Sequence, residues 1–263
     1  MSALVSDLDT RIAPAAELAR LAGDVALRHY RSHLVVEIKA DGSPVTAADR
    51  AAEEAARDWV RRFFPEDGVL GEEFGEERVG ARRRWVIDPI DGTKAFVRGV
   101  PLWGSLVALC EGDAVLAGAA YFPAVDELIA AAPGVGCWWN GSRCTVSPVA
   151  SLGAATVLTT DGRFCERPER RAGWERVAAA ASVARTWGDS FGYLLVATGR
   201  AEMMCDAILS PWDAAAFLPI VKEAGGTFTD WDGRVTAFGG SAVATNRALA
   251  AGVRTLLAEP SRG

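Results

Sequence analysis

Hydrophobic residues near the start of the chain recur at the spacing of a helix. The segment 12–32 places apolar side chains on one helical face, at Leu18, Leu21, Ala22 and Val25. The residues KADGSP break this pattern, and a second helix is predicted over 47–63. Thr46 and Asp49 have the spacing of a capping box, in which the carboxylate reaches back to an unpaired backbone donor at the helix start.

The middle of the chain has the pattern of strands joined by tight turns. The residues RRWVI, at 83–87, predict a strand that follows an acidic loop, GEEFGEE, at 71–77. Two later segments reverse at Gly-Asp, positions 112–113, and at Asn-Gly, positions 140–141. Both dipeptides favour two-residue turns, so each segment predicts a β-hairpin.

Strands and helices alternate after about residue 148. Predicted strands cover 155–159, 183–187 and 202–206, and predicted helices cover 168–181, 190–198 and 213–224. This alternation predicts an α/β half over 148–263 that follows an α+β half over 1–147. No Gly- or Ser-rich linker separates them, so we expect the halves to pack together with any site in the cleft between them. Pro219 is expected to kink the last helix, because it removes one backbone hydrogen bond.

Composition narrows the class of protein. Half of the 263 residues are hydrophobic, enough for a large core. The net charge is −6 and the basic residues are scattered, which argues against a nucleic-acid partner and an anionic membrane surface. The first twenty residues lack the apolar core of a signal peptide, and no later run approaches membrane-spanning length. We therefore expect a cytoplasmic, globular protein.

The cysteines and histidines do not predict a zinc site. The five cysteines include no Cys-x-x-Cys pair, and the two histidines lie together in the first helical segment. The expected state is a set of buried, reduced thiols, at Cys110, Cys137, Cys144, Cys165 and Cys205.

Acidic residues stand out in four segments, and in three of these a neighbouring glycine or proline fixes a sharp turn. The four segments are VTAAD with Asp49, GEE with Glu72, DPID with Asp88 and Asp91, and PWD with Asp213. Clustered carboxylates repel one another unless a cation lies between them, and their oxygens suit Mg²⁺ or Mn²⁺ better than zinc. The acids therefore predict a divalent metal site, where metal ions can hold a phosphate oxygen and activate a water.

The motif WVIDPIDGT predicts how two of these acids are aimed. The strand is expected to end at Asp88, because Pro89 keeps the preceding residue extended. Gly92 frees the backbone to turn into a helix that begins near Thr93. Such a turn directs Asp88 and Asp91 to one side and leaves the amides of Gly92 and Thr93 available to an anion.

The motifs GEE, WVIDPIDGTKAF and WDAAAFLPIVKEAGG follow one another in the order typical of a known family. From about Lys39 to Asn246 the chain resembles the inositol monophosphatase superfamily of Mg²⁺-dependent, lithium-sensitive phosphatases. The resemblance implies a layered αβαβα sandwich, usually dimeric, with two or three Mg²⁺ ions per site. It also implies hydrolysis of a small phosphate monoester by direct attack of a metal-activated water.

The resemblance assigns metal ligands to five positions of this sequence. Glu72, Asp88 and the backbone carbonyl of Ile90 would hold one metal ion. Asp88, Asp91 and Asp213 would hold the second. Glu72 would also lie near a third, weaker metal.

Catalytic and phosphate contacts are implied in the same way. Asp49 and Thr93 would position the attacking water, with Glu72 as the third catalytic residue. Asp91 and the amides of Gly92 and Thr93 would contact the substrate.

The segment RTWGDSFGYLLVATGRAEMMCDAILSPWD bears on the leaving group. The acid Asp189 favours a cationic leaving group over a neutral polyol. The sequence of this segment resembles the histidinol-phosphatase branch of the family, which releases L-histidinol from L-histidinol phosphate. Asp189 would pair with the ammonium, and Ser190, Glu202 and Asp206 would be further contacts. Capping of the helix that begins near Ser190 is the alternative role for Asp189.

Other substrates and mechanisms remain open or are disfavoured. Inositol 1-phosphate, broader sugar phosphates and adenosine 3′,5′-bisphosphate are alternative substrates, although only Arg185 and Arg200 could meet a second phosphate. A phosphoenzyme route of the haloacid dehalogenase type needs Asp-x-Asp, and Pro89 occupies the required position. A non-enzymatic role does not explain why every ligand position is filled. Lys39 is equally consistent with a phosphate contact and with solvation.

Overall fold

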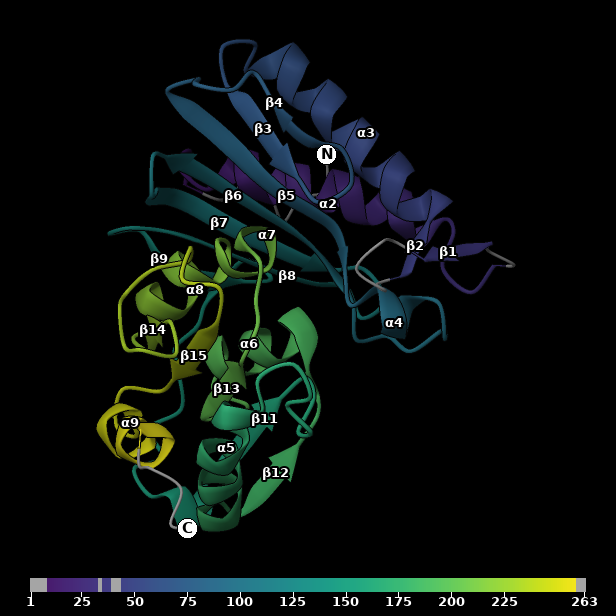
Figure 1. The fold of residues 1–263 in the computed structure, drawn as a ribbon. Helices are drawn as coiled ribbons and strands as arrows, with labels where there is room; N and C mark the ends of the chain where they lie inside the picture. The colour runs from purple at the N-terminus through teal and green to yellow at the C-terminus, as the bar shows by residue number, and fades with distance from the viewer. Residues whose placement is uncertain (1–8, 33–34, 39–43, 259–263) are drawn as a thin grey trace.

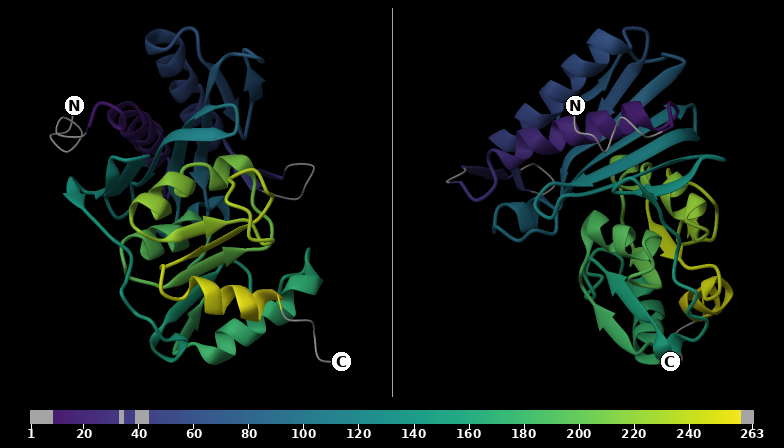
Figure 2. Two further views of the ribbon diagram at one scale, coloured as in Figure 1. Left: turned by 90° about the vertical axis from the view of Figure 1, so that its left-hand side faces the viewer. Right: turned by 180° about the vertical axis from the view of Figure 1, so that it is seen from behind.

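The computed structural model describes residues 9–32, 35–38 and 44–258, and it has five layers (Figures 1 and 2). Helices cover both faces of each of two sheets, and one helical layer lies between the sheets. This arrangement confirms the αβαβα sandwich. The outer helices are α2 (Ala13–Leu27) and α3 (Ala47–Phe63) on one side and α5 (Pro168–Ala180) and α9 (Ala250–Ala258) on the other; the inner ones are α6 (Asp189–Ala197), α7 (Pro211–Ala214) and α8 (Phe217–Glu223).

The larger sheet has eight strands, all antiparallel to their neighbours except the parallel pair β3 and β5. The strands in sheet order are β10 (Ser142–Arg143), β9 (Gly136–Trp139), β8 (Glu127–Ala132), β7 (Ala114–Phe122), β6 (Gly104–Glu111), β5 (Arg83–Asp91), β3 (Gly68–Gly71) and β4 (Gly75–Glu77). The hairpins predicted around 112–113 and 140–141 are confirmed as β6–β7 and β9–β10. A separate pair joins β1 (Val36–Ile38) and β2 (Pro44–Thr46).

The smaller sheet has five strands and is built by the second half of the chain. Its order is β12 (Val183–Arg185), β11 (Thr156–Thr159), β13 (Met203–Asp206), β15 (Ala242–Thr245) and β14 (Thr227–Thr229). The first three are parallel, and β15 runs antiparallel to both neighbours. The predicted alternation of strands and helices over 155–206 is therefore confirmed. The sequence patterns did not predict β14, β15, α9 or the short helix η1 (Leu152–Ala154). Of the short helix α4 (Thr93–Phe96), they predicted only the start.

The core between the two sheets draws on both halves of the chain. Leu106 from β6 belongs to the same buried cluster as Tyr193 from α6, Phe217 from α8 and Phe228 from β14. Burial of such large side chains contributes about 1.5–3 kcal/mol each, so the halves stabilise one another. The division of the chain at 147/148 stays a prediction.

The helix predicted over 213–224 is wrong in one respect, because two short helices, α7 and α8, replace it. Pro219 has no N–H to donate to the carbonyl of Ala215, so one bond that would join the two helices cannot form. The carbonyl of Ala216, at the junction, lies against Gly118 of β7, where a Cβ atom would overlap it. This close approach places the junction of α7 and α8 directly against β7.

Two further expectations are corrected by the sheet. The acidic segment 71–77 is not a simple loop, since Gly75–Glu77 forms β4 and pairs with β3. Strand β5 does not end at Asp88 but continues to Asp91, with an irregularity in register between these two residues. An irregularity of this kind redirects side chains at the end of a strand.

The cysteines are free thiols, as expected, but they are not all buried. Cys110, Cys137 and Cys205 are buried, Cys144 is partly buried, and Cys165 is exposed. Throughout the described part of the chain, every helix is too short or too polar to span a membrane.

Candidate active site

Helix α3 begins with the predicted capping box. Asp49 accepts hydrogen bonds from the backbone N–H and the hydroxyl of Thr46, at 2.8 and 2.6 Å, and Thr46 Oγ1 accepts from the N–H of Ala48. Asp49 is buried, and burial raises the pKa of its carboxyl. Its second oxygen lies 3.5 Å from the hydroxyl of Thr93. The helix start therefore places Asp49 next to the turn that follows β5.

The turn after β5 is held by short-range hydrogen bonds. The N–H of Ile90 donates to Asp88 Oδ1 at 2.9 Å, and the carbonyl of Ile90 accepts the hydroxyl of Thr93 at 3.0 Å. Gly92 has φ +82°, and a Cβ atom there would lie 2.8 Å from the carbonyl oxygen of Leu102. Only glycine fits this left-handed, crowded position without strain, so the sequence DGT is needed for the turn.

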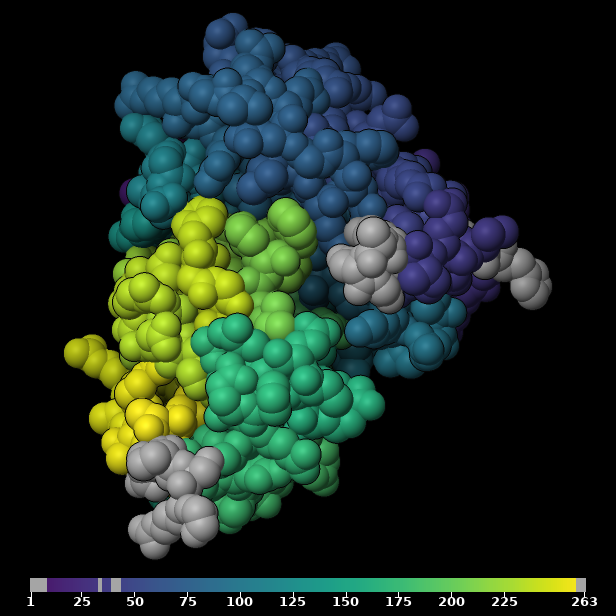
Figure 3. Space-filling model, viewed as in Figure 1, coloured from purple at the N-terminus to yellow at the C-terminus, as the bar shows by residue number. Residues whose placement is uncertain are grey.

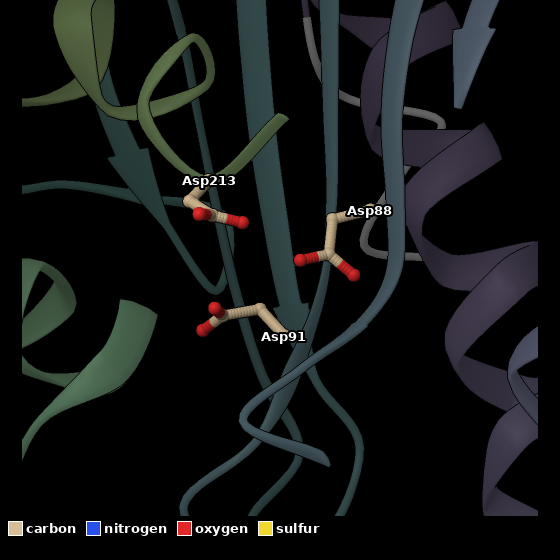
Figure 4. Close-up of side chains that lie close together, drawn as sticks. All are labelled: Asp88, Asp91 and Asp213. Carbon is tan, nitrogen blue, oxygen red and sulfur yellow. The ribbon is translucent and has the colours of Figure 1, made fainter. Parts of the chain in front are cut away.

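Three carboxylates converge beside this turn, from Asp88, Asp91 and Asp213 (Figure 4). One oxygen of each lies within 4.8 Å of the others. Asp88 and Asp91 come from β5, whereas Asp213 comes from the first turn of α7, where it accepts the N–H of Ser210 at 3.0 Å. The structure thus brings together acids separated by more than a hundred residues.

Electrostatic repulsion in this cluster is strong. Burial raises the pKa of Asp88 well above its usual range, and the charges of Glu72 and Asp91 add to the effect. Burial raises the pKa of Asp91 to about 6, although its hydrogen bond from Ser190 opposes this. Burial and the charge of Asp91 likewise raise the pKa of Asp213 well above normal. A cation between the carboxylates would relieve the repulsion.

The donor set fits a hard divalent cation. All three converging ligands are carboxylate oxygens, which suit Mg²⁺ or Mn²⁺. Glu72 is close enough for its charge to act on Asp88 and Asp91, but it does not belong to the group that converges within 4.8 Å among the described residues. Its N–H donates to the carbonyl of Ile87 at 3.3 Å, which holds it alongside the end of β5.

Helix α6 connects the metal acids to the leaving-group segment. It begins at Asp189, with Gly188 as the N-cap and no side-chain cap hydrogen bond, so the capping role for Asp189 is wrong. Asp189 has φ +51°, and its N–H donates to Thr160 Oγ1 at 2.8 Å. The N–H of Ser190 donates to Asp91 Oδ2 at 2.6 Å. The hydroxyl of Ser190 is buried and has no hydrogen-bond partner within the described ranges.

The carboxyl of Asp189 is also affected by the negative charges of neighbouring acids. Burial raises the pKa of its carboxyl to about 8, and the charges of Asp91 and Asp206 act in the same direction. Asp206 accepts the N–H of Thr160 at 3.1 Å and the hydroxyl of Tyr193 at 2.9 Å. A cationic group bound here would stabilise the ionised form of Asp189.

A cavity of about 250 Å³ lies beside these acids, in the region where the two halves meet. Its polar lining includes Lys94, Thr160, Asp161, Arg167 and Asp206. Figure 3 shows the two halves in contact across this face of the molecule. The mixture of both signs of charge suits a small molecule that carries an anion and a cation.

One predicted substrate residue, Glu202, is not brought to the site. Glu202 accepts the N–H of Thr156 at 2.6 Å, at the start of the parallel strands β11 and β13, whereas Asp206 lies at their end. Four residues of strand separate Glu202 from Asp206 by about 13 Å, so the expectation for Glu202 is corrected. Lys39 lies outside the described residues.

Sequence reasoning missed Thr160 and Tyr193, which hold Asp189 and Asp206 in place. The signal for Thr160 was present. It follows predicted strand 155–159, and the carboxyl ends of parallel strands meet at one edge of a sheet. Tyr193 gave no signal, because an aromatic residue in an apolar helix is expected to be core.

Comparisons with known proteins point to one family. The model of the "Inositol monophosphatase family" matches residues 7–261. A histidinol-phosphatase from Chlorobaculum parvum is 44% identical over 95% of this chain and 96% of its own, and one from Mycobacterium tuberculosis is 41% identical over 82% and 85%. The crystal structure of extragenic suppressor protein suhB from Bartonella henselae has a TM-score of 0.87 at 29% identity, over 92% of this chain and 96% of its own. The chain belongs to the inositol monophosphatase family.

Proposed function

We propose that this chain is a Mg²⁺-dependent phosphatase that hydrolyses L-histidinol phosphate to L-histidinol and phosphate, a step of histidine biosynthesis. The position of Asp189 carries the proposal, because its N–H is bound to Thr160, which lines the cavity, and the N–H of the next residue is bound to Asp91. The similarity to two histidinol-phosphatases over most of the chain supports the same substrate.

The metal-binding residues would be those that the family resemblance indicates. Asp88, Asp91 and Asp213, with Glu72 and the carbonyl of Ile90, would hold two Mg²⁺, with a third, weaker position near Glu72. Bound Mg²⁺ supplies charge for the phosphate oxygens and lowers the pKa of a water. Convergence of the three aspartates supports this ligand set.

The remaining groups of the turn would orient the water and the phosphate. The hydroxyl of Thr93 lies between Asp49 and the carbonyl of Ile90, so it can donate to either and accept from a water. The amides of Gly92 and Thr93 would receive phosphate oxygens, and Asp91 would lie against the substrate. In-line attack by the oriented water then gives phosphate without a phosphoenzyme.

The leaving group would occupy the cavity. Asp189 would accept the ammonium of histidinol, and Asp206, held by Tyr193, would provide a second negative charge. Ser190, whose N–H already contacts Asp91, would lie where phosphate and leaving group meet. Inositol 1-phosphate has no cation to compensate Asp189, so the site favours the amino alcohol.

The test measures phosphate release from histidinol phosphate, inositol 1-phosphate, fructose 1,6-bisphosphate and adenosine 3′,5′-bisphosphate, with Mg²⁺ or with chelator. We expect histidinol phosphate to lead in kcat/KM by more than about a hundredfold, equivalent to about 2.7 kcal/mol. Chelation should abolish release. A lead for another substrate would contradict the proposed substrate while leaving the metal mechanism in place.

Asp189→Asn tests the ammonium contact directly. We expect kcat/KM for histidinol phosphate to fall about tenfold or more, since a hydrogen bond to a charged group contributes about 1.5–3 kcal/mol. The value for inositol 1-phosphate should change little. Asp113→Asn, at the exposed β6–β7 turn, is the control for loss of one negative charge. Equal losses for both substrates would contradict a role in recognising the cation.

Two family properties belong to the same proposal. We expect a homodimer, measured by light scattering on a size-exclusion column, and inhibition of phosphate release by Li⁺. A monomer or a lithium-insensitive enzyme would contradict these two expectations without affecting the metal ligands.

A further inference from the structure

A buried carboxylate, Glu53, lies beneath the loop that carries Glu72. It is one helical turn after Asp49 on α3, and none of its surface is exposed. Its Oε2 accepts the N–H of Glu73 at 2.7 Å, and its Oε1 accepts the N–H of Phe74 at 3.2 Å. The two backbone amides that follow Glu72 are therefore bound by one buried acid.

The residue before Glu72 shows how closely the loop approaches this acid. A Cβ atom at Gly71 would overlap Glu53 Oε1, so only glycine allows the loop to lie over the carboxylate. On the other side, the N–H of Glu72 itself is bound to the carbonyl of Ile87 in β5. Glu72 is thus fixed between β5, which carries Asp88, and helix α3.

The charge of Glu53 is balanced by Arg57, the next residue on the same helical face. Arg57 Nε donates to Glu53 Oε1 at 2.8 Å, and its other nitrogens donate to the carbonyl of Gly75 at 2.5 Å and to Glu77 at 3.2 Å. A buried charge is retained only with such partners. The pair therefore holds both ends of the β3–β4 turn against α3.

We propose that Glu53 is a positioning residue that sets the place of Glu72 at the metal site, and that Gly71 is glycine because the Glu53 carboxylate fills the space of its side chain. The inference rests on the proposed metal-dependent function. Charge-assisted hydrogen bonds that two amide N–H groups donate to a carboxylate are shorter and stronger than neutral ones. Mutation of groups that orient metal ligands typically costs 10–100-fold in metal affinity or activity.

The test compares Glu53→Gln with Glu54→Gln, an exposed neighbour on the same helix. Mg²⁺ binding is measured by isothermal titration calorimetry without substrate, and folding by circular dichroism. We expect Glu53→Gln to bind Mg²⁺ about 10–100-fold more weakly. Its kcat at saturating Mg²⁺ should change much less than its Mg²⁺ affinity, and Glu54→Gln should match the wild type in both.

A folded Glu53→Gln variant with wild-type Mg²⁺ affinity would overturn the inference and leave Glu53 a role in stability alone. If Glu53→Gln does not fold, Gly71→Ala takes its place, because it keeps both charges of the ion pair and adds a methyl group that overlaps the Glu53 carboxylate beneath the loop. Wild-type affinity in that variant would overturn the inference equally. Failure of the wild-type protein to bind Mg²⁺ would instead contradict the metal site of the proposed function, so the two failures are distinguishable.

Discussion

Asp88 lies where the negative charges of three other carboxylates act together. Its pKa is raised by burial, then by Glu72, Asp91 and Asp213, and its Oδ1 is already bound to the N–H of Ile90. The carboxylate of Asp88 therefore increases the charge repulsion in the metal-free protein and attracts the cation when one is bound. Its substitution separates these two effects.

For Asp88→Asn we expect kcat/KM for histidinol phosphate to fall by at least about a hundredfold, because stabilisation of the transferring phosphoryl group depends on the cation that Asp88 helps to hold. The melting temperature in chelator should not fall, because a buried like charge is removed. Asp113→Asn serves as the control. Retention of activity in Asp88→Asn with metals chelated would contradict the metal mechanism.

At the scale of residues, some parts of the site were predicted well from the sequence and one residue was placed wrongly. Short-range motifs predicted the capping box of Asp49 and the glycine turn after Asp91, since each depends on neighbours within a few positions. Glu202 and Asp206 differ only in which end of one strand they occupy. That difference follows from strand direction, which the predicted alternation of strands and helices supplies but a motif of neighbouring residues does not.

At the scale of elements, the junction of α7 and α8 follows Asp213 by two to three residues and packs against β7. The sequence predicted a kink at Pro219, but it did not predict that the helix divides into α7 and α8. The carbonyl of Ala216 lies against Gly118, an approach made by two segments nearly a hundred residues apart. Hydrophobic periodicity predicts helices and strands, but it does not predict which distant segments of the backbone lie in contact.

Gly118→Ala tests this junction. The added methyl group would overlap the carbonyl of Ala216, and overpacking of this kind costs about 1–3 kcal/mol. We expect a lower melting temperature and weaker Mg²⁺ binding, because α7 carries Asp213. Gly252→Ala is the matched control, since a Cβ atom there meets no neighbour within 4 Å. Unchanged stability and Mg²⁺ affinity in Gly118→Ala would contradict the importance of this contact.

For the whole molecule, the layered fold was predicted from the alternation of elements and the family resemblance. No motif predicted which residues form the core that the two halves share. The core between the sheets joins residues from β6, α6, α8 and β14. This core holds the two halves together although the clustered carboxylates between them repel one another. Stability should therefore depend on pH and on Mg²⁺ together.

In chelator we expect stability to fall as pH rises from 6 to 8. The pKa values of Asp91 and Asp189 are raised from 3.8 to about 6 and about 8, so over this range the folded state binds more protons than the unfolded state. Thermal unfolding should show a decrease in melting temperature of at least about 2–4 °C, the change that accompanies about 1 kcal/mol in a chain of this size.

Saturating Mg²⁺ should reverse this loss, since a ligand at a hundred times its dissociation constant stabilises the folded state by about 2.7 kcal/mol. The control is the same titration of Asp88→Asn, in which Mg²⁺ should give little protection. A melting temperature in chelator that rises between pH 6 and pH 8 would contradict the sign of these shifts.

The origin of the three aspartates has a consequence for synthesis of the protein on the ribosome. Asp88 and Asp91 lie in the first half of the chain, and Asp213 follows Asp88 by 125 residues (213 minus 88). All strands of the larger sheet are therefore translated before the third aspartate. Until Asp213 is added, these strands carry neither the full charge repulsion of the site nor its full set of metal ligands.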